Sequence, residues 1–263
     1  MAPILTATAQ SAEVSSSSRR RSATIFSRWR TGLRRPKAIT HTLRGEACAA
    51  FFDFDNTIAT VDVLDDLVQR FSVTQDWMAL EEAWRRGAIG SKECLDGQLR
   101  EVRVTDSEFS KYLASITLDP AFPHVVRLLR SQGIEPVILS DSFCLVIERI
   151  LAHHGLGDLK VYANELCLIE ERLMPSFPHL DGCARCANCK AQYLLAAKQQ
   201  GRTTFYVGDG LSDVCAAKHA DFLFAKDTLL ANCRREGRVC IPFESLSDVH
   251  TYLTTRVQWL VSR

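Results

Sequence analysis

The chain has 263 residues, of which 46% are hydrophobic and 24% are charged, a composition typical of an ordinary globular protein. This length allows one substantial domain and a smaller one, with a core that needs no disulfides. No stretch approaches the ~20 consecutive apolar residues of a membrane-spanning helix. A membrane pump is therefore excluded, and no membrane partner is expected.

Charge is distributed unevenly along the chain. Residues 1–45 hold nine Lys or Arg and a single acid, whereas the remainder has a net charge of −7. An acidic body is a poor match for nucleic acid, so no nucleic-acid partner is expected. A small phosphorylated metabolite could still bind through local positive groups and a metal.

Residues 1–45 read as a basic, Ser- and Arg-rich tail without a sustained apolar period that would offset the entropy lost on ordering. This composition fits an organelle transit peptide, and it fits an inert disordered extension about equally well. The expected location is the cytoplasm, or a mitochondrion or plastid if the tail is a transit peptide.

After the tail, the apolar run 49–52 predicts a buried strand. Apolar residues then recur at helical spacing and predict about four helices in a small insertion at 61–118. The core domain comprises 46–60 and 119–263, where helices alternate with short strands. Strands are predicted at 136–139, 160–163, 204–207 and 221–224, and helices at 145–151, 190–199 and 212–219. This α/β alternation predicts a Rossmann-like parallel sheet with helices on both faces and an active site at the carboxyl ends of the strands.

Two carboxylates, Asp53 and Asp55, follow the first predicted strand. In an extended chain they would lie on the same side, and a cation such as Mg²⁺ would relieve their repulsion and neutralise a substrate phosphate. Alone, the pattern is explained as often by a turn and helix cap.

The continuation to Thr57 makes the pattern Asp-x-Asp-x-Thr, which resembles the first motif of the haloacid dehalogenase superfamily. Ser140 resembles the second motif, a hydroxyl that hydrogen-bonds phosphate. Lys190 resembles the third, a cation beside the nucleophile, and 208–213 resembles the fourth, which supplies metal-binding acid. Each has a commonplace explanation alone, but their occurrence together and in order favours the family.

The resemblance implies a Mg²⁺-dependent phosphatase that forms an aspartyl phosphate on Asp53. Asp55 is then the general acid and base and also a metal ligand through its backbone carbonyl, and Asp209 completes the metal site. Asp213 orients the metal shell through its waters. The acid at position 55 favours phosphoryl transfer over carbon–halogen cleavage. The alternatives are a phosphomutase of the same fold and a non-catalytic sensor or interaction protein.

Insertion of the helices between the first two motifs resembles the phosphoserine phosphatase-like subfamily, subfamily IB. The resemblance implies that 61–118 form a helical cap domain that closes over the site. Asp62 stands where those enzymes place a Glu that meets the substrate amine. Asp141 and Ser142 replace two glycines, so two side chains stand where backbone amides would approach the substrate. All three are candidate substrate contacts, and phosphoserine itself is put in doubt.

The stretches 162–165 and 177–190 give a closer resemblance, to the 2-hydroxy-3-keto-5-methylthiopentenyl-1-phosphate phosphatases, and a looser one to the phosphocholine/phosphoethanolamine phosphatases. With this resemblance, Asn164 joins the candidate substrate contacts. The physiological ester and the oligomeric state are left open.

Three of the ten cysteines, Cys183, Cys186 and Cys189, have the spacing C-x-x-C-x-x-C. They could bind zinc with His179 as a fourth ligand, form a redox-sensitive pair, or remain reduced thiols that pack behind the lysine at position 190. The spacing leaves all three open.

Overall fold

The computed structural model describes residues 41–178, 183 and 185–260. The described residues belong to one compact unit, and most of the predicted tail lies outside them. The tail boundary needs a correction, because strand β1 (His41–Arg44) lies within the predicted tail. It pairs in parallel with β9 (Val257–Leu260), a strand at the other end of the chain that the sequence patterns did not predict.

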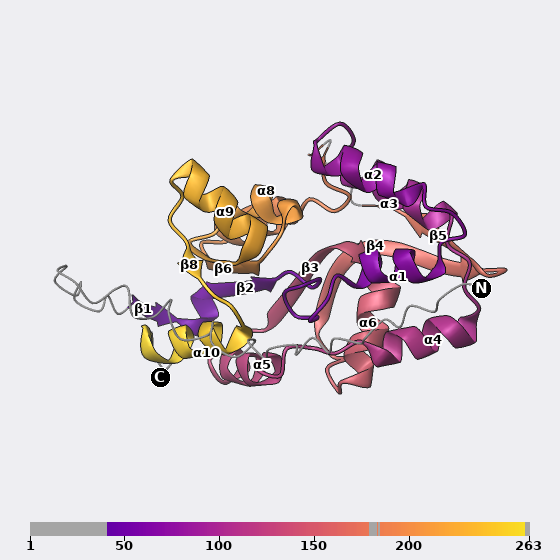
Figure 1. Ribbon diagram of the computed structural model, residues 1–263. Coiled ribbons are helices and arrows are strands. Elements are labelled where there is room, and N and C mark those ends of the chain that lie inside the picture. The colour runs from indigo at the N-terminus through magenta and orange to yellow at the C-terminus, as the bar shows by residue number, and fades with distance from the viewer. Residues whose placement is uncertain (1–40, 179–182, 184, 261–263) are drawn as a thin grey trace, which may run out of the picture. The chain divides into compact units, whose positions relative to one another are not determined.

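The central sheet has seven strands in the order β5-β4-β3-β2-β6-β7-β8 (Figure 1). These are β2 (Cys48–Phe52), β3 (Pro136–Phe143), β4 (Lys160–Ile169), β5 (Arg172–Ser176), β6 (Thr203–Gly208), β7 (Phe222–Ala225) and β8 (Ile241–Pro242). All neighbouring pairs are parallel except the antiparallel β4–β5 pair. The predicted α/β fold is confirmed, with one antiparallel strand added at its edge.

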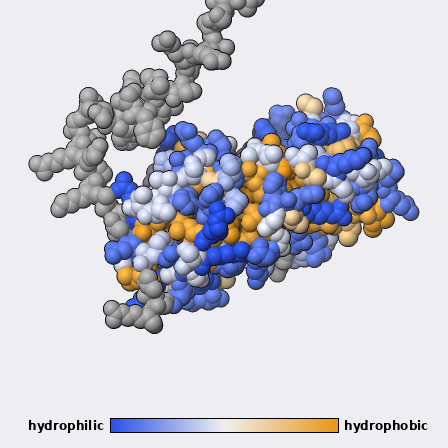
Figure 2. Space-filling view, turned by 90° about the horizontal axis from the view of Figure 1, so that it is seen from below, coloured by the Kyte–Doolittle hydropathy of each residue, from blue (hydrophilic) through white to orange (hydrophobic). Residues whose placement is uncertain are grey.

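Helices cover both faces of this sheet. Successive residues of a strand point to opposite sides, so strand β2 contributes side chains to the packing on each face. Ala49 and Phe51 join a core cluster on one face, and Phe52 joins the cluster on the other. The first cluster includes α7 (Lys190–Gln199), α8 (Val214–Ala217) and α9 (Asp227–Glu236), and the second includes α5 (Phe122–Ser131), α6 (Cys144–His153) and α10 (Leu246–Thr255). On the surface drawn in Figure 2, hydrophilic residues dominate, and hydrophobic ones show mainly in a band across its middle.

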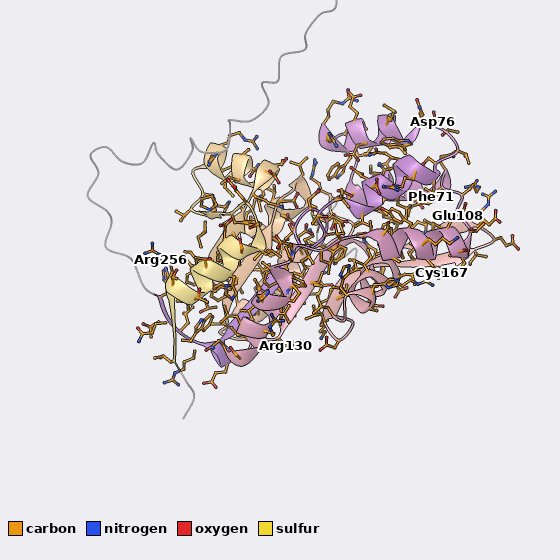
Figure 3. The ribbon with its side chains drawn as sticks, turned by 60° about the horizontal axis from the view of Figure 1, so that its bottom comes forward. Phe71, Asp76, Glu108, Arg130, Cys167 and Arg256 are labelled. Atoms are coloured by element: carbon orange, nitrogen blue, oxygen red, sulfur yellow. The ribbon has the colours of Figure 1, made fainter. Side chains whose placement is uncertain are left out.

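The insertion holds four helices, the number that the sequence predicted. They are α1 (Val63–Phe71), α2 (Trp77–Arg85), α3 (Ser91–Arg100) and α4 (Asp106–Ser115). The chain enters and leaves the insertion side by side, because Ala59 and Leu118 form an antiparallel bridge. In Figure 3 the insertion is marked by the labels of Phe71, Asp76 and Glu108, and it lies at the opposite end of the compact unit from Arg256. That the insertion acts as a cap domain stays a prediction.

The β4–β5 hairpin is the largest departure from the predicted elements. Strand β4 continues beyond the expected 160–163, and the chain reverses at Glu170 and Glu171, which have φ values of 47° and 63°. Two-residue hairpin turns with positive φ usually use Asn or Gly, so these glutamates gave no turn signal.

The predicted helix at 212–219 is a 3₁₀ turn (Leu211–Asp213) followed by the short α8. None of the described helices is long and apolar enough to cross a membrane.

Candidate active site

All four predicted motifs meet at the carboxyl edge of the central sheet. Strand β2 lies between β3 and β6, and Phe52 is in register with Ile138 and Val207. The Asp53 amide therefore donates to the Val207 carbonyl at 2.9 Å, which brings the first and fourth motifs side by side. This is the edge at which ligands bind in open parallel sheets.

Lys190 supplies a buried positive charge to this edge. Its Nζ lies 2.5 Å from Asp53 Oδ1, 2.6 Å from Asp213 Oδ1 and 3.1 Å from Ser212 Oγ. Burial disfavours the charge, but the two carboxylates raise the pKa of Lys190 well above its usual value. The side chain is 1% exposed, so it is held as an ammonium ion between two acids.

Asp213 anchors the loop that follows β6. Its Oδ1 accepts hydrogen bonds from Lys190 Nζ and from the Tyr206 hydroxyl, and its Oδ2 accepts the backbone N–H groups of Asp209 and Gly210 at 2.9 and 3.0 Å. Four bonds occupy the two oxygens of a carboxylate. Asp213 therefore contacts the site through the lysine and the loop backbone. Its predicted role through metal-bound waters stays a prediction.

The side chains that could hold a metal are Asp53 and Asp209. One oxygen of each and one oxygen of Asp213 form a group whose members lie within 4.8 Å of one another. Burial, followed by neighbouring carboxylates, raises the pKa of Asp53 to about 7 against the opposing effect of Lys190, and the pKa of Asp209 to about 9. Thr57 Oγ1 donates to Asp209 Oδ1 at 3.3 Å. Clustered carboxylates with too little nearby positive charge fit a hard divalent cation.

The surroundings of the Asp55 carboxyl group favour its protonated form. Its Oδ1 accepts the Val63 N–H at 2.9 Å. Burial and then the carboxylates of Asp62 and Asp53 raise its pKa well above the usual value. These effects favour the protonated form, which a general acid needs.

A cavity of about 340 Å³ opens at these residues between the sheet edge and the inserted helices. Ser140, Asp62, Asp141 and Ser142 line it together with Asp53, Asp55 and Asp209. Ser140 Oγ accepts the Ser142 N–H at 3.0 Å. Asp141 Oδ2 and Ser142 Oγ are buried and have no hydrogen-bond partner within the described part of the chain, so both are available to a ligand.

Asn164, expected to contact substrate, is not among the residues that line the cavity. It is fully buried, and its Nδ2 donates to the carbonyls of Asp141 and Ser142 at 2.6 and 3.2 Å. The register that pairs it with Phe143 places it beside the end of β3. Asn164 therefore supports the loop that lines the cavity, and its contact with a substrate stays a prediction.

Some residues of the site gave no sequence signal. Tyr206, on a strand read only as core, donates to Asp213, and Asn188 Nδ2 donates to the carbonyls of Ser140 and Tyr162 at 3.0 and 2.9 Å. Residues of the insertion also line the cavity, among them Asp65, Glu81, Trp84 and Arg85. Helical periodicity assigned these positions to inserted helices, but it does not say which side of a helix faces the cavity.

Asp62 also caps helix α1, because its Oδ1 accepts the Asp65 N–H at 2.9 Å. We expect Asp62→Ala to lower the free energy of unfolding by about 1 kcal/mol, and Asp62→Asn to leave it nearly unchanged, because asparagine caps equally well. Chemical denaturation of both variants checks this. Equal losses in the two variants would contradict the capping role.

The fold and the site together define a phosphatase of the haloacid dehalogenase type. The fold is similar to that of a phosphoserine phosphatase solved as an analogue of its phosphoaspartyl intermediate, with a TM-score of 0.62, 21% sequence identity, and coverage of 78% of this chain and 98% of that one.

Residues 48–234 match the model of the family described as "Putative Phosphatase", and the chain belongs to this family. It is similar to a 2-hydroxy-3-keto-5-methylthiopentenyl-1-phosphate phosphatase of Exiguobacterium sibiricum, at 25% identity over 77% of this chain and 94% of that protein. A protein of the same name from Brevibacillus brevis is 28% identical over 68% of this chain and 82% of its own length. The predicted resemblance is confirmed, and the protein is a phosphoric monoester hydrolase.

Proposed function

We propose that this protein is a Mg²⁺-dependent phosphatase that hydrolyses a small phosphorylated metabolite through an aspartyl phosphate on Asp53. The observation that carries the proposal is the position of this carboxylate. It is bonded at 2.5 Å to the buried ammonium of Lys190, lies close to Asp209, and lines the cavity.

In the first step, an Asp53 oxygen attacks phosphorus as the bond from phosphorus to the alcohol oxygen breaks. Asp55 gives its proton to the alcohol oxygen, so a neutral alcohol leaves. The Lys190 ammonium orients the attacking carboxylate and lies beside the developing negative charge. Because Ser140 Oγ already accepts a backbone N–H, its own proton is free for a phosphoryl oxygen.

The carboxylates of Asp53 and Asp209, with the backbone carbonyl of Asp55, would hold the Mg²⁺. When bound, the ion supplies positive charge that neutralises the phosphate and keeps both carboxylates deprotonated. Asp213 remains bonded to the lysine and to the loop backbone, and so keeps both in place.

In the second step, Asp55 is a carboxylate and takes a proton from water. The water oxygen bonds to phosphorus, the bond from phosphorus to the Asp53 oxygen breaks, and inorganic phosphate is released. Asp55 has regained its proton, and Asp53 is again a free carboxylate. Both groups thus return to their starting states.

The substrate we propose is a small phosphomonoester, in keeping with the names of the relatives. A panel of such esters that includes p-nitrophenyl phosphate, assayed for released phosphate with Mg²⁺ and with EDTA, tests the proposal. We expect turnover that depends on Mg²⁺. Isomerised sugar phosphate in place of free phosphate would indicate a mutase, and the lack of both turnover and acyl phosphate across the panel would favour a sensor. The location, cytoplasm or organelle, stays a prediction.

Mg²⁺ should stabilise the protein more at high pH than at low pH. Asp53 and Asp209 have folded-state pKa values of about 7 and about 9, raised from 3.8. The metal-free folded state therefore binds protons more tightly than the unfolded chain, and the contribution of these groups to stability is lost as pH rises through those values.

Mg²⁺ competes with these protons, so the increase in Tm on adding it should be larger at about pH 8 than at about pH 5.5. Thermal denaturation with Mg²⁺ and with EDTA at both pH values measures the difference. An increase that is independent of pH would contradict the assignment of these two carboxylates to the metal.

A further inference from the structure

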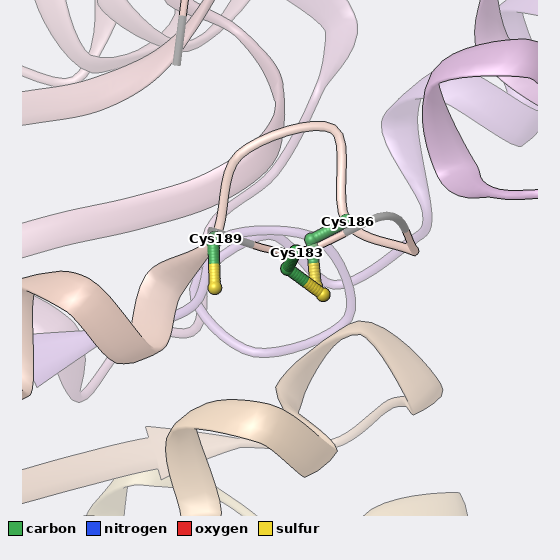
Figure 4. A group of neighbouring side chains, drawn as sticks. All are labelled: Cys183, Cys186 and Cys189. Carbon is green, nitrogen blue, oxygen red and sulfur yellow. The ribbon is translucent and has the colours of Figure 1, made fainter. Parts of the chain in front are cut away.

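The cysteine-rich loop before α7 brings three thiols together. The Sγ atoms of Cys183, Cys186 and Cys189 lie within 4.8 Å of one another, and the first two are 3.4 Å apart. All three cysteines are free. Figure 4 shows their sulfur atoms on the same side of the loop.

A fourth thiol, from a different element, lies beside these three but outside the group whose Sγ atoms are all within 4.8 Å of one another. Cys215, on α8, packs against this cluster, and its side chain interacts with those of Cys183 and Cys186. The sequence offered His179 as the fourth ligand, but that residue lies outside the described residues. Proximity along the chain could not indicate Cys215, because the sheet topology brings α8 beside the start of α7.

We propose that this cluster is a zinc site in which four thiolates hold one ion: Cys183, Cys186, Cys189 and Cys215. Zinc–sulfur bonds of about 2.3 Å in a tetrahedron separate the sulfur atoms by about 3.8 Å. The Cys183 and Cys186 sulfur atoms, at 3.4 Å, are close to that separation, and Cys189 Sγ lies within 4.8 Å of both. Cys186 and Cys189 are only 8% and 9% exposed, which suits a closed structural site without a water ligand.

The other two interpretations explain less. A redox pair needs only Cys183 and Cys186, and it leaves two further thiols gathered at the same point without a reason. Reduced thiols that merely fill space pack as well when dispersed, as the buried Cys48 does in the core. Convergence of four thiols from two separate segments is what a tetrahedral thiolate site requires.

The zinc ion would join the two segments that carry the buried ion pair of the active site. Cys189 directly precedes Lys190, and Cys215 follows Asp213 by two residues. The 2.6 Å bond between this lysine and this aspartate spans the same two segments. The cysteines are therefore positioning residues, which fix where the ammonium and the loop after β6 lie.

The same loop also contacts the insertion. The Arg185 carbonyl accepts the Ser91 N–H at 2.8 Å, and Arg185 Nη1 donates to the Gly87 carbonyl at 3.3 Å. Both partners lie in or beside the turn between α2 and α3. By holding the loop in one conformation, the zinc would also preserve these contacts between insertion and core.

Metal analysis of the full-length protein, purified under reducing conditions in Mg²⁺ without chelator, tests the proposal. We expect about one zinc per chain. A mercurial thiol reagent should release it, and cobalt(II) in its place should show the strong thiolate charge-transfer absorption of a tetrahedral site. Wild-type protein that binds no zinc even after zinc titration, or that keeps its zinc when the thiols are blocked, would overturn the proposal.

Variants locate the site. Residues that only hydrogen-bond to metal ligands contribute ~10–100-fold to metal affinity. Cys215 is proposed as a ligand itself, so Cys215→Ser should lower zinc affinity by at least this factor. Cys167→Ser is the matched control, because that thiol is exposed on β4 (Figure 3). Cys215→Ser with wild-type affinity would overturn the four-cysteine site. Asp209→Asn should retain its zinc. Loss of zinc from this variant would also overturn the four-cysteine site. These readouts do not depend on turnover, so they separate the zinc site from the proposed phosphatase reaction.

Discussion

Asp53→Asn is expected to abolish phosphate release while the protein stays folded. Asparagine has nearly the same size, but a neutral amide cannot act as the nucleophile. Loss of the nucleophile lowers kcat by roughly 10⁴-fold or more in enzymes with covalent intermediates. The fold should survive because Lys190 keeps its 2.6 Å ion pair with Asp213. Initial rates of phosphate release and trapping of the acyl phosphate measure the effect.

Asp76→Asn is the matched control for this variant. Asp76 is exposed at the start of α2, makes no side-chain capping bond, and lies at the outer end of the insertion (Figure 3). It should retain wild-type turnover and the trapped intermediate. If Asp53→Asn turned over at the wild-type rate, the assignment of the nucleophile would be wrong.

Lys190→Met should destabilise the protein by about 3–5 kcal/mol, because removing one partner of a buried ion pair leaves uncompensated charge. Here two acids, Asp53 and Asp213, would lose their shared ammonium, and both are almost fully buried. Activity should fall as well. Chemical denaturation at neutral pH measures the loss, which should shrink at acid pH, because burial raises the pKa of Asp53 and favours its protonated form.

The same helix offers the matched control, Lys198→Met. Lys198 makes a 2.7 Å ion pair with Asp221, but both side chains are more than one third exposed, so the loss should be at most about 1 kcal/mol. Equal destabilisation by the two substitutions would show that Lys190 is not the central charge of the site.

The sequence was most informative where a strand ends in a charged side chain. A buried apolar run followed by Asp53 predicts both the strand and its functional end, and alternating helices and strands bring Ser140 and Asp209 to the same edge. The structure places these residues at one edge as predicted, because parallel strands of one sheet end together. Local patterns are sufficient for such features.

Features that depend on contacts between distant segments were not predicted. The β4–β5 hairpin turns at two glutamates without a turn residue, and β1 is stabilised by β9 from the far end of the chain. The direction in which Asn164 points depends on a strand register that no local pattern encodes. Cys215 joins the thiol cluster only because α7 and α8 lie together on one face of the sheet.

The pairing of β1 with β9 limits where proteolytic processing of the N-terminal segment can occur. The His41 ring packs edge-on against Phe222 with centroids 4.6 Å apart, and the His41 N–H donates to the Arg256 carbonyl at 2.9 Å. A cut before His41 keeps both contacts. A cut after Arg44 removes the whole of β1 and leaves β9 with an unpaired edge, which is a template for aggregation. A mature form that keeps this strand pair must therefore begin at or before His41.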